Sequence, residues 1–466
     1  MKSQKMKKIP FSRLAEIIQA RKPALTGGEQ RFITGVSTDS RTVKPGDCFF
    51  ALTGDNFDGH NFVGQAISKG AACAVVARDI KGGPILKVAD TVKALGDFAR
   101  HYRQQAGYKV VAITGSVGKT TTRQIVYYVL SRHFRVSQAQ KNFNNQIGLP
   151  LTLLDADEQT QIVVAELGTN YPGEIAYLTR IALPDVAVIT SIYPVHLEGL
   201  GDLQTIIDEK LSISGCLPPD GVLLINGDFD QLVGACRDTF KEAGRFYTFG
   251  KSKGCDFRAR NINSSGSGSS FTIDNTQVYL PLPGPGNVDN ALAAWAVCSR
   301  FGLTVEDFAQ AVKTQPAVSM RAELLQIGTL TLLNDCYNAN PASMRNALDI
   351  LTNLDSTGKR RLVFICGDMA ELGAHTEQLH AELGASIANT GVQLLIAVGK
   401  FAKMAAETAK EKSADVLQIK CFEDTLSACN NLKDYIKDYD IILVKGSRTA
   451  KLEMAVERLI QIWRPR

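Results

Sequence analysis

The stretch VVAITGSVGKTTTRQIVYYVL, from Val110 to Leu130, constrains the fold more than any other part of this sequence. Its first four residues are apolar and mostly β-branched, which is typical of a buried parallel strand. Gly115 and Gly118 then predict a tight turn, and Thr120–Leu130 carries apolar residues on one helical face. The stretch therefore predicts a strand, a glycine turn and a helix, the unit from which α/β folds are built.

The same turn has the parts of a phosphate-binding loop. Backbone N–H groups at a helix N-terminus bind anions, Lys119 supplies a cation, and a threonine hydroxyl can hold Mg²⁺. The strict P-loop pattern needs a glycine five residues before the Gly-Lys pair, but Ile113 occupies that position. Taken alone, the stretch is either a nucleotide site with an altered loop or a structural turn. The candidate phosphate-contacting residues are Thr114, Gly115, Ser116, Val117, Gly118, Lys119, Thr120 and Thr121.

A second buried-strand pattern, TQIVVAELGTN from Thr160 to Asn170, contains the acid Glu166 at its end. An acid at the tip of a neighbouring parallel strand is placed to bind Mg²⁺ beside a phosphate loop. The alternative is a solvated carboxylate at a strand end. With the loop present, we interpret Glu166 as a metal ligand.

Composition bounds the class of protein. At 466 residues the chain should hold about three domains of roughly 150 residues each. Hydrophobic residues make up 45% of the chain and charged residues 21%, which is ordinary for a globular protein. The net charge of +5 does not indicate binding of duplex nucleic acid. We expect no signal peptide and no membrane span, because charges interrupt every apolar run. The ten cysteines form no C-x-x-C pair and are typical of free thiols in the cytoplasm.

Alternating strand and helix patterns predict an α/β protein of three domains. These are a small N-terminal α/β domain over residues 1–107, a central domain over 108–316 with a mostly parallel sheet and the phosphate loop, and a Rossmann-like C-terminal domain over 317–466. Because the C-terminal part lacks G-x-G-x-x-G, we predict no dinucleotide there. The segment NSSGSGSS, residues 263–270, is predicted to be a flexible loop between short antiparallel strands.

The C-terminal pattern is regular enough for individual elements. The predicted strands are Leu330–Leu333, Leu362–Cys366, Leu394–Val398 and Ile441–Val444, and the predicted helices begin at Ala342 and His375, span about Ala402–Ala409 and Leu426–Ile436, and close the chain.

Several stretches together resemble the Mur ligases, the ATP-dependent amide-bond-forming enzymes of peptidoglycan synthesis. The family's loop has the form T-G-[ST]-x-G-K-T without an earlier glycine, so TGSVGKTTT is its own version of the phosphate loop and Ile113 is no defect. The pattern D-x-Y-N-A-N-P in LLNDCYNANPASM resembles that of the branch of the family that adds D-alanyl-D-alanine, whereas sister enzymes commonly carry D-Y-A-H-x-P. The stretches CGDMAELG and VKGSR also match, and the resemblance covers nearly the whole chain.

The resemblance implies substrate contacts in two places. In STDSRTVKPGDCFFALTGDNFDGHNF, residues near the uridine diphosphate would be Ser40, Arg41, Asp58 and His60. In KNFNNQIGLPLTLL, Asn144 and Asn145 would contact the muramoyl-peptide. Without the resemblance these would be an ordinary surface loop and an asparagine-rich turn before a helix.

The resemblance also implies a second metal site. In SIYPVHLEGLGDLQTIIDEK, His196 would help to hold Mg²⁺ and Lys210 would be carbamylated, joining Thr120 and Glu166 as metal ligands. Where the family often has an acid two residues after this lysine, the sequence has Ser212. The ordinary alternative is a lysine on a helix surface paired with Asp208 or Glu209.

The remaining matches concern ATP and the dipeptide. In LPGPGNVDNALAAWAV, Asn287 and Asn290 match the family's adenine-contacting stretch, whereas Gly286 replaces its histidine. Arg321 would contact the ATP phosphates and Asp335 the ribose. The dipeptide pocket would be shaped by Asn338, Asn340 and Pro341.

The resemblance therefore implies a cytoplasmic, monomeric ligase with Lys119, Glu166, His196 and Lys210 as its catalytic residues. ATP and Mg²⁺ are the expected cofactors, and UDP-N-acetylmuramoyl-tripeptide and D-alanyl-D-alanine are the expected partners. Two alternatives stay open, a folylpolyglutamate synthase-like ligase and a nucleotide-binding homologue without catalytic activity.

Overall fold

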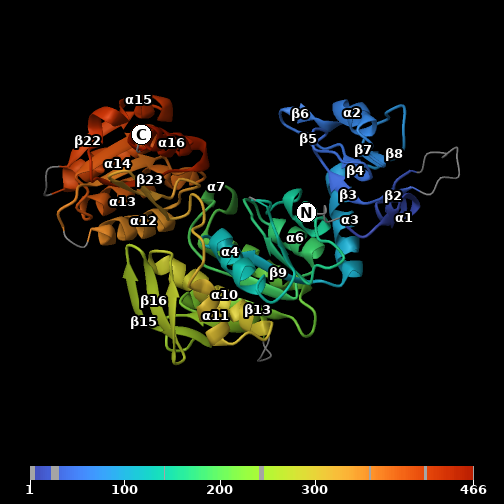
Figure 1. Ribbon diagram of the computed structural model, residues 1–466, viewed down its shortest axis with the longest axis horizontal. Coiled ribbons are helices and arrows are strands. Elements are labelled where there is room, and N and C mark those ends of the chain that lie inside the picture. The colour runs from blue at the N-terminus through green and yellow to red at the C-terminus, as the bar shows by residue number, and fades with distance from the viewer. Residues whose placement is uncertain are drawn as a thin grey trace.

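The computed structural model describes residues 6–21, 31–140, 142–240, 246–355, 358–413 and 417–464. It contains three main sheets, and the N-terminal and C-terminal sheets lie on opposite sides of the central one (Figure 1). Each sheet is mostly parallel and carries helices, so the predicted α/β fold class is confirmed. None of the helices in the described part of the chain is long and apolar enough to cross a membrane.

The N-terminal unit is built on a parallel sheet in the order β3-β4-β7-β8. Its strands are β3 (Gly35–Ser37), β4 (Asp47–Phe50), β7 (Cys73–Val76) and β8 (Ile85–Lys87). The smaller elements of this unit are β1 (Ile9–Pro10), β2 (Phe32–Ile33), the hairpin of β5 (Thr53–Gly54) and β6 (Phe57–Asp58), and the helices α1 (Phe11–Ile17), α2 (Val63–Ser68) and α3 (Thr91–Ala106).

The central sheet has nine strands in the order β10-β11-β9-β12-β13-β14-β15-β16-β17. The first six run parallel: β10 (Val136–Gln138), β11 (Ile162–Glu166), β9 (Lys109–Thr114), β12 (Val186–Ile189), β13 (Val222–Asn226) and β14 (Phe246–Gly250). The last three form an antiparallel extension: β15 (Phe257–Ser265), β16 (Gly268–Ile273) and β17 (Thr276–Leu280). The helices are α4 (Lys119–Leu130), α5 (Gly148–Leu154), α6 (Glu174–Ala182), α7 (Leu197–Leu200), α8 (Leu203–Leu211), α9 (Asp230–Thr239), α10 (Pro285–Arg300) and α11 (Val305–Val312).

Alternate residues of β9 belong to two different hydrophobic clusters. Val110 and Ala112 pack in a cluster with α3, α5 and α6, while Val111 and Ile113 pack with α4 and α10. Successive strand side chains point to opposite faces of a sheet, so both faces are covered by helices. This double burial is why the sequence of the strand is a continuous apolar run.

The C-terminal unit has six strands in the order β18-β19-β23-β20-β21-β22, of which only β18 is antiparallel to its neighbour. Its strands are β18 (Glu323–Ile327), β19 (Leu330–Asn334), β20 (Leu362–Gly367), β21 (Leu394–Val398), β22 (Gln418–Phe422) and β23 (Ile441–Lys445). Its helices are α12 (Pro341–Leu354), α13 (Thr376–Ala388), α14 (Lys400–Lys412), α15 (Thr425–Tyr435) and α16 (Glu453–Trp463).

Two sequence expectations are corrected by the structure. The segment 263–270 is not a flexible loop, because β15 extends to Ser265 and β16 begins at Gly268. Its serines pair across the hairpin, and the Ser269 hydroxyl donates to the Leu282 carbonyl oxygen at 3.3 Å. The edge strands β18 and β22 were not predicted, because exposed polar residues interrupt their apolar pattern.

Candidate active site

A cavity of about 670 Å³ lies where the central and C-terminal units meet. The glycine loop after β9, the end of β11 and the segment around His196 line its central side. The segments 337–343 and 370–372, together with Arg448, line its C-terminal side. A second cavity of about 370 Å³ adjoins it, and Val117, Gly118, Arg321 and Ser343 line both.

The two glycines of the loop are required by close packing as well as by backbone conformation. Gly115 has φ of +146°, and a Cβ there would lie 2.0 Å from the Thr190 Oγ1 atom. Gly118 has φ of +87°, and a Cβ there would lie 2.2 Å from the Asn290 Oδ1 atom. Ile113, by contrast, is still part of β9 and is fully buried. In this chain the loop therefore begins after the position where the strict pattern has its first glycine.

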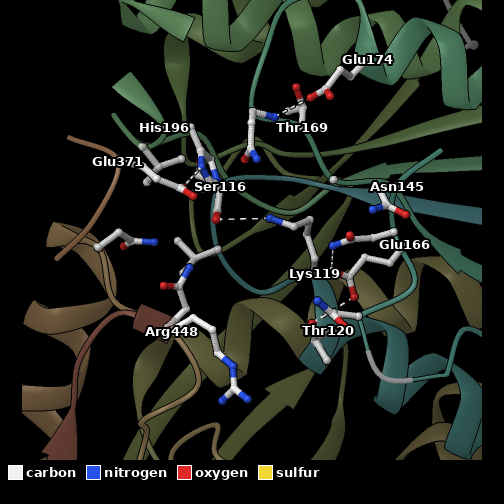
Figure 2. A pocket seen from close by; sticks show the side chains of 18 of the residues that line it. Ser116, Lys119, Thr120, Asn145, Glu166, Thr169, Glu174, His196, Glu371 and Arg448 are labelled. Atoms are coloured by element: carbon white, nitrogen blue, oxygen red, sulfur yellow. Dashed lines mark hydrogen bonds and ion pairs between the residues drawn. The ribbon is translucent and has the colours of Figure 1, made fainter. Parts of the chain in front are cut away.

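Lys119 is the first residue of α4 and lies half-buried at the wall of the larger cavity. Its Nζ donates to the carbonyl oxygen of Gly115 at 2.6 Å. It also donates to the carbonyl oxygen of Ser116 at 3.4 Å, the contact drawn in Figure 2. Burial lowers the pKa of Lys119, while the nearby Glu166 carboxylate acts in the opposite direction. The loop thus holds its own cation against its backbone, beside the N–H groups that begin α4.

Glu166 lies at the end of β11, paired in register with Ile113 of β9. Its Oε2 accepts a hydrogen bond from the Thr120 hydroxyl at 2.9 Å, and its Oε1 accepts one from the Asn144 side-chain amide at 3.1 Å. The buried Arg123 guanidinium lies 3.8 Å away. A threonine hydroxyl and a carboxylate are oxygen ligands of the kind that Mg²⁺ prefers, so Thr120 and Glu166 fit that ion.

His196 lines the same cavity and contacts the opposite unit. Its Nδ1 lies 2.5 Å from the Glu371 Oε2 atom (Figure 2). The hydrogen bond lowers the pKa of Glu371. Within the described ranges, no three His, Cys, Asp or Glu side chains are grouped to hold a metal.

Lys210 on α8 is 1% exposed and does not line the cavity. Burial, followed by the charge of Lys119, places the pKa of Lys210 well below its usual range. The ordinary alternative, a surface ion pair, is wrong. Glu209 instead accepts hydrogen bonds from the N–H groups of Gly173 at 2.6 Å and Ile175 at 2.7 Å, where α6 begins. Asp208 accepts one from Gln204.

The asparagines predicted to contact adenine hold two helices together. Asn290 accepts a hydrogen bond from the Thr122 hydroxyl on α4 at 3.2 Å and donates to Asn287 at 3.1 Å. Asn287 donates to the Pro283 carbonyl oxygen at 2.7 Å. Both line the smaller cavity together with Gly286, whose N–H donates to the Asn346 Oδ1 atom of α12 at 3.3 Å.

Arg321 and Asp335 also face this smaller cavity from the C-terminal unit. Asp335 pairs with the buried Lys445 Nζ at 2.5 Å and accepts the Ala322 N–H at 3.0 Å. The Arg321 guanidinium lies 4.1 Å from the centre of the Tyr337 ring, a cation–π arrangement.

The predicted dipeptide residues divide into two kinds. Asn338 lines the larger cavity, and among the described residues its one hydrogen bond is the one its backbone oxygen accepts from Lys445. Asn340 caps α12 by accepting the Ser343 N–H at 2.9 Å, and Pro341 is the first residue of that helix. Asn145 is likewise a cap, because it accepts the Gly148 N–H at 2.9 Å, although it also lines the cavity.

The residues predicted near the uridine diphosphate are not among those lining either cavity. Ser40 donates to Gln65 at 2.7 Å, and the exposed Arg41 pairs with Asp39 at 2.7 Å. His60 contacts Asp58 at 2.6 Å and accepts the Ala77 N–H at 2.9 Å. A third cavity, of about 550 Å³, lies between residues 34–47 and 138–155 without touching any of the four.

Sequence reasoning gave no role to Glu371, Arg448 or Tyr337, which all line the larger cavity. Glu371 lies in the stretch CGDMAELG and Arg448 lies in VKGSR. Both stretches match the family, but the match gave neither residue a role. Glycines beside charged residues at strand ends were the available signal. Their meeting with the phosphate loop depends on how two units pack and has no local signature.

The fold and the cavity define a three-unit α/β protein of the phosphate-loop class. Models of the Mur ligase family, catalytic domain, the Mur ligase middle domain and the Mur ligase glutamate ligase domain match residues 32–103, 113–298 and 320–448. A relative from Bacillus subtilis, named UDP-N-acetylmuramoyl-tripeptide–D-alanyl-D-alanine ligase, is 38% identical over 93% of this chain and 94% of its own length. The chain belongs to the Mur ligase family.

Solved structures agree in fold over nearly the whole chain. A crystal structure of MurF from Acinetobacter baumannii has a TM-score of 0.87 and 32% identity, covering 98% of this chain and 99% of the other. A MurF ligase from Thermotoga maritima, solved in complex with ADP, has a TM-score of 0.79 and 26% identity, covering 92% and 97% of the two chains.

Proposed function

We propose that the protein joins D-alanyl-D-alanine to UDP-N-acetylmuramoyl-tripeptide in peptidoglycan precursor synthesis, with ATP converted to ADP and phosphate. One observation carries the proposal: the phosphate loop and the YNANP segment line the same cavity from two different units. A group activated at the loop would thus lie beside the pocket expected to hold the dipeptide. The Bacillus subtilis relative bears the name of this activity.

The reaction has two steps. The γ-phosphoryl group of ATP passes to the terminal carboxylate of the tripeptide and gives an acyl phosphate. The free amine of the dipeptide then attacks the acyl carbon, and phosphate leaves. In such reactions the protein mainly positions reactants and screens charge. We assign the screening to Lys119, which would exchange its loop carbonyls for phosphate oxygens, and to Arg321 at the junction of the two cavities.

Thr120, Glu166, His196 and Lys210 are the proposed residues for Mg²⁺. The ion, when bound, neutralises phosphate charge during transfer. Lys210 contributes as a carbamate in this proposal. Its burial favours the uncharged amine that can combine with carbon dioxide, and no hydrogen bond or ion pair holds it among the described residues. An ammonium would instead repel a cation, by about 4 kcal/mol per unit charge at 4 Å with an effective dielectric near 20.

Other parts of the proposal concern the whole chain. Ser40, Arg41, Asp58 and His60 remain candidates for the uridine diphosphate, and Asn144 and Asn145 for the muramoyl-peptide. The remaining ATP contacts are assigned to Asn287, Asn290 and Asp335. The domain borders stay near residues 107 and 316. We place the reaction in the cytoplasm, where ATP and UDP-linked precursors meet, and expect a monomer, which light scattering would test.

The decisive experiment is an assay of phosphate release with ATP, Mg²⁺, UDP-N-acetylmuramoyl-tripeptide and D-alanyl-D-alanine. We expect release to require both peptide substrates and mass spectrometry to detect the joined pentapeptide. Activity with a folate and glutamate instead would favour the folylpolyglutamate synthase-like alternative. Nucleotide binding without turnover of any of these substrates would favour the non-catalytic homologue.

A further inference from the structure

The contact between His196 and Glu371 joins the central unit to the C-terminal unit at the wall of the larger cavity. His196 precedes α7, and Glu371 follows β20, 175 residues away in the sequence. Both residues have left-handed backbones, with φ of +53° and +62°. Side chains other than glycine seldom adopt this conformation unless the surrounding structure holds it.

The backbones of the two segments also touch. The Glu198 N–H donates to the Glu371 carbonyl oxygen at 3.4 Å, and a Cβ at Gly373 would lie 3.2 Å from the Glu198 Cα atom. The carboxylate is therefore delivered to the histidine by a packed junction rather than by a free side chain. Figure 2 shows Glu371 directed at the His196 ring, at the cavity wall.

The contact uses one of the two ring nitrogens. Nδ1 faces the Glu371 carboxylate, whereas Nε2 has no hydrogen-bond partner among the described residues. In protein metal sites a histidine that binds the ion through one nitrogen usually donates the other N–H to a carboxylate, a backbone carbonyl or water, which fixes the tautomer and the orientation of the ring. The arrangement here has that form, with the carboxylate supplied by the other unit.

We propose that Glu371 is a positioning residue that holds the His196 ring for Mg²⁺ and thereby makes the central metal site depend on docking of the C-terminal unit. The inference rests on the metal role proposed for His196. Nucleotide and metal would bind tightly in the central unit only when the dipeptide-bearing unit is in place. The acyl phosphate would then form only next to the dipeptide amine that attacks it, with water excluded.

The test measures metal binding without turnover. Mn²⁺ is titrated into the full-length protein with a non-hydrolysable ATP analogue, and free Mn²⁺ is followed by electron paramagnetic resonance. We expect Glu371→Ala to weaken Mn²⁺ binding by about 10- to 100-fold, the usual effect of losing such a carboxylate. Glu371→Gln keeps a hydrogen-bond acceptor and should weaken it less. Glu377→Ala, an exposed carboxylate on α13 of the same unit, is the matched control and should have no effect.

A double-mutant cycle separates positioning from general damage. If Glu371 acts through His196, Glu371→Ala should change Mn²⁺ affinity little once His196→Ala is present. Unchanged affinity in Glu371→Ala, or effects of the two changes that simply add, would overturn the inference. Thermal unfolding checks that each variant is folded. If Glu371→Ala does not fold, the Mn²⁺ affinity of Glu371→Gln is used to test the inference.

The same measurements keep this inference apart from the proposed function. If the parent protein does not synthesise the pentapeptide, the proposed function is refuted, whatever the Mn²⁺ titration shows. Normal Mn²⁺ binding in His196→Ala alone would remove the metal role of His196, and the inference with it, while leaving dipeptide addition intact.

Discussion

At the scale of single residues, two lysines near the phosphate loop have opposite surroundings. Lys119 contacts the carbonyl oxygens of its own loop, at the wall of the cavity. Lys210 lies in the core, where its charge has no ion-pair partner among the described residues. The same side chain therefore serves as a phosphate-binding cation at one position and as a candidate for chemical modification at the other.

Lys119→Ala should lower the rate of phosphate release by on the order of 10³-fold or more, because a phosphate-clamping charge is lost at the reacting group. The melting temperature should change little, since within the described part of the chain the side chain bonds only its own loop. Steady-state kinetics and thermal unfolding measure the two effects. Lys313→Ala, an exposed lysine of the same unit, is the control. Near-normal turnover in Lys119→Ala would exclude the phosphate-loop role.

Lys210 predicts a pH dependence of stability. Its pKa is lowered in the folded chain, so between that value and the unfolded value of about 10.4 the unfolded chain binds an extra proton. This difference lowers the free energy of unfolding by its full amount at pH values below the pKa of Lys210 in the folded chain. The effect disappears at pH values above the pKa of the unfolded chain. In buffer free of carbon dioxide, Lys210→Met should therefore be more stable than the parent near neutral pH, with the gain shrinking toward pH ~10.

Denaturant unfolding of the parent and of Lys210→Met, near neutral pH and near pH ~10, measures this difference. A gain in stability that does not change with pH would contradict the prediction. A companion experiment addresses the carbamate. Lys210→Ala should be nearly inactive, and a short carboxylic acid should restore part of the activity, whereas ¹³C-labelled bicarbonate should give a carbamate signal only in the parent. An active alanine variant would refute the modification.

At the scale of elements, the segment before α12 combines capping with substrate recognition. Asn340 and Ser343 form a reciprocal capping box, so Asn340 is committed to the start of the helix. The Asn338 side chain has no hydrogen-bond partner in the part of the chain that the structure describes, and the residue lines the larger cavity. Two asparagines in one motif therefore have different tasks.

Substitution of these two residues should separate stability from binding. Asn340→Ala should lower the free energy of unfolding by about 1 kcal/mol through loss of the cap. Asn338→Ala should raise KM for D-alanyl-D-alanine by about 5- to 150-fold, the equivalent of 1–3 kcal/mol for an unpaired polar partner, and should leave KM for ATP nearly unchanged.

Unfolding curves and substrate titrations on both variants provide the comparison. Asn353→Ala, at an exposed position late in α12, controls for loss of an amide on this helix. A change in the ATP requirement of Asn338→Ala instead of the dipeptide requirement would show that the pocket assignment is wrong.

At the scale of the whole molecule, the central and C-terminal units meet through glycines at the start of α10. Gly284 has φ of +93°, and a Cβ there would lie 2.6 Å from Ile350 of α12. Gly302, just after α10, has φ of +82° but open space around its Cβ position. Both positions have a positive φ, and only Gly284 contacts the other unit. Gly284 also has ψ of 150°, which places it outside the left-handed helical region, in a region that almost only glycine adopts.

Gly284→Ala should therefore raise KM for ATP and lower stability more than Gly302→Ala does. Both changes carry a backbone penalty of about 1–3 kcal/mol for a side chain at positive φ, and only the first displaces α12 from the nucleotide cavity. Kinetics and denaturant unfolding on the two variants measure the difference. Equal effects would mean that the junction is not needed for nucleotide binding.

The sequence by itself determined the elements and the local chemistry. Double burial made β9 and β11 continuous apolar runs, and the glycine turn before Lys119 indicated a phosphate loop, which the resemblance to the Mur ligases then favoured over a structural turn. These features are readable because each depends on neighbours within one turn or one strand. The strands β18 and β22 escaped prediction because each lies at an edge of its sheet, where polar residues face solvent.

Only the tertiary structure decided which of these residues meet. Glu371 contacts His196 although 175 residues separate them in the sequence, and Lys210 is buried in the core. Asn290 accepts a hydrogen bond from α4 and donates one to Asn287, so the two asparagines join two helices. The tertiary structure also left Ser40, Arg41, Asp58 and His60 away from the two cavities. Such outcomes follow from the packing of whole sheets and units, whose contacts are separated by tens to hundreds of residues, and no periodicity or short motif encodes them.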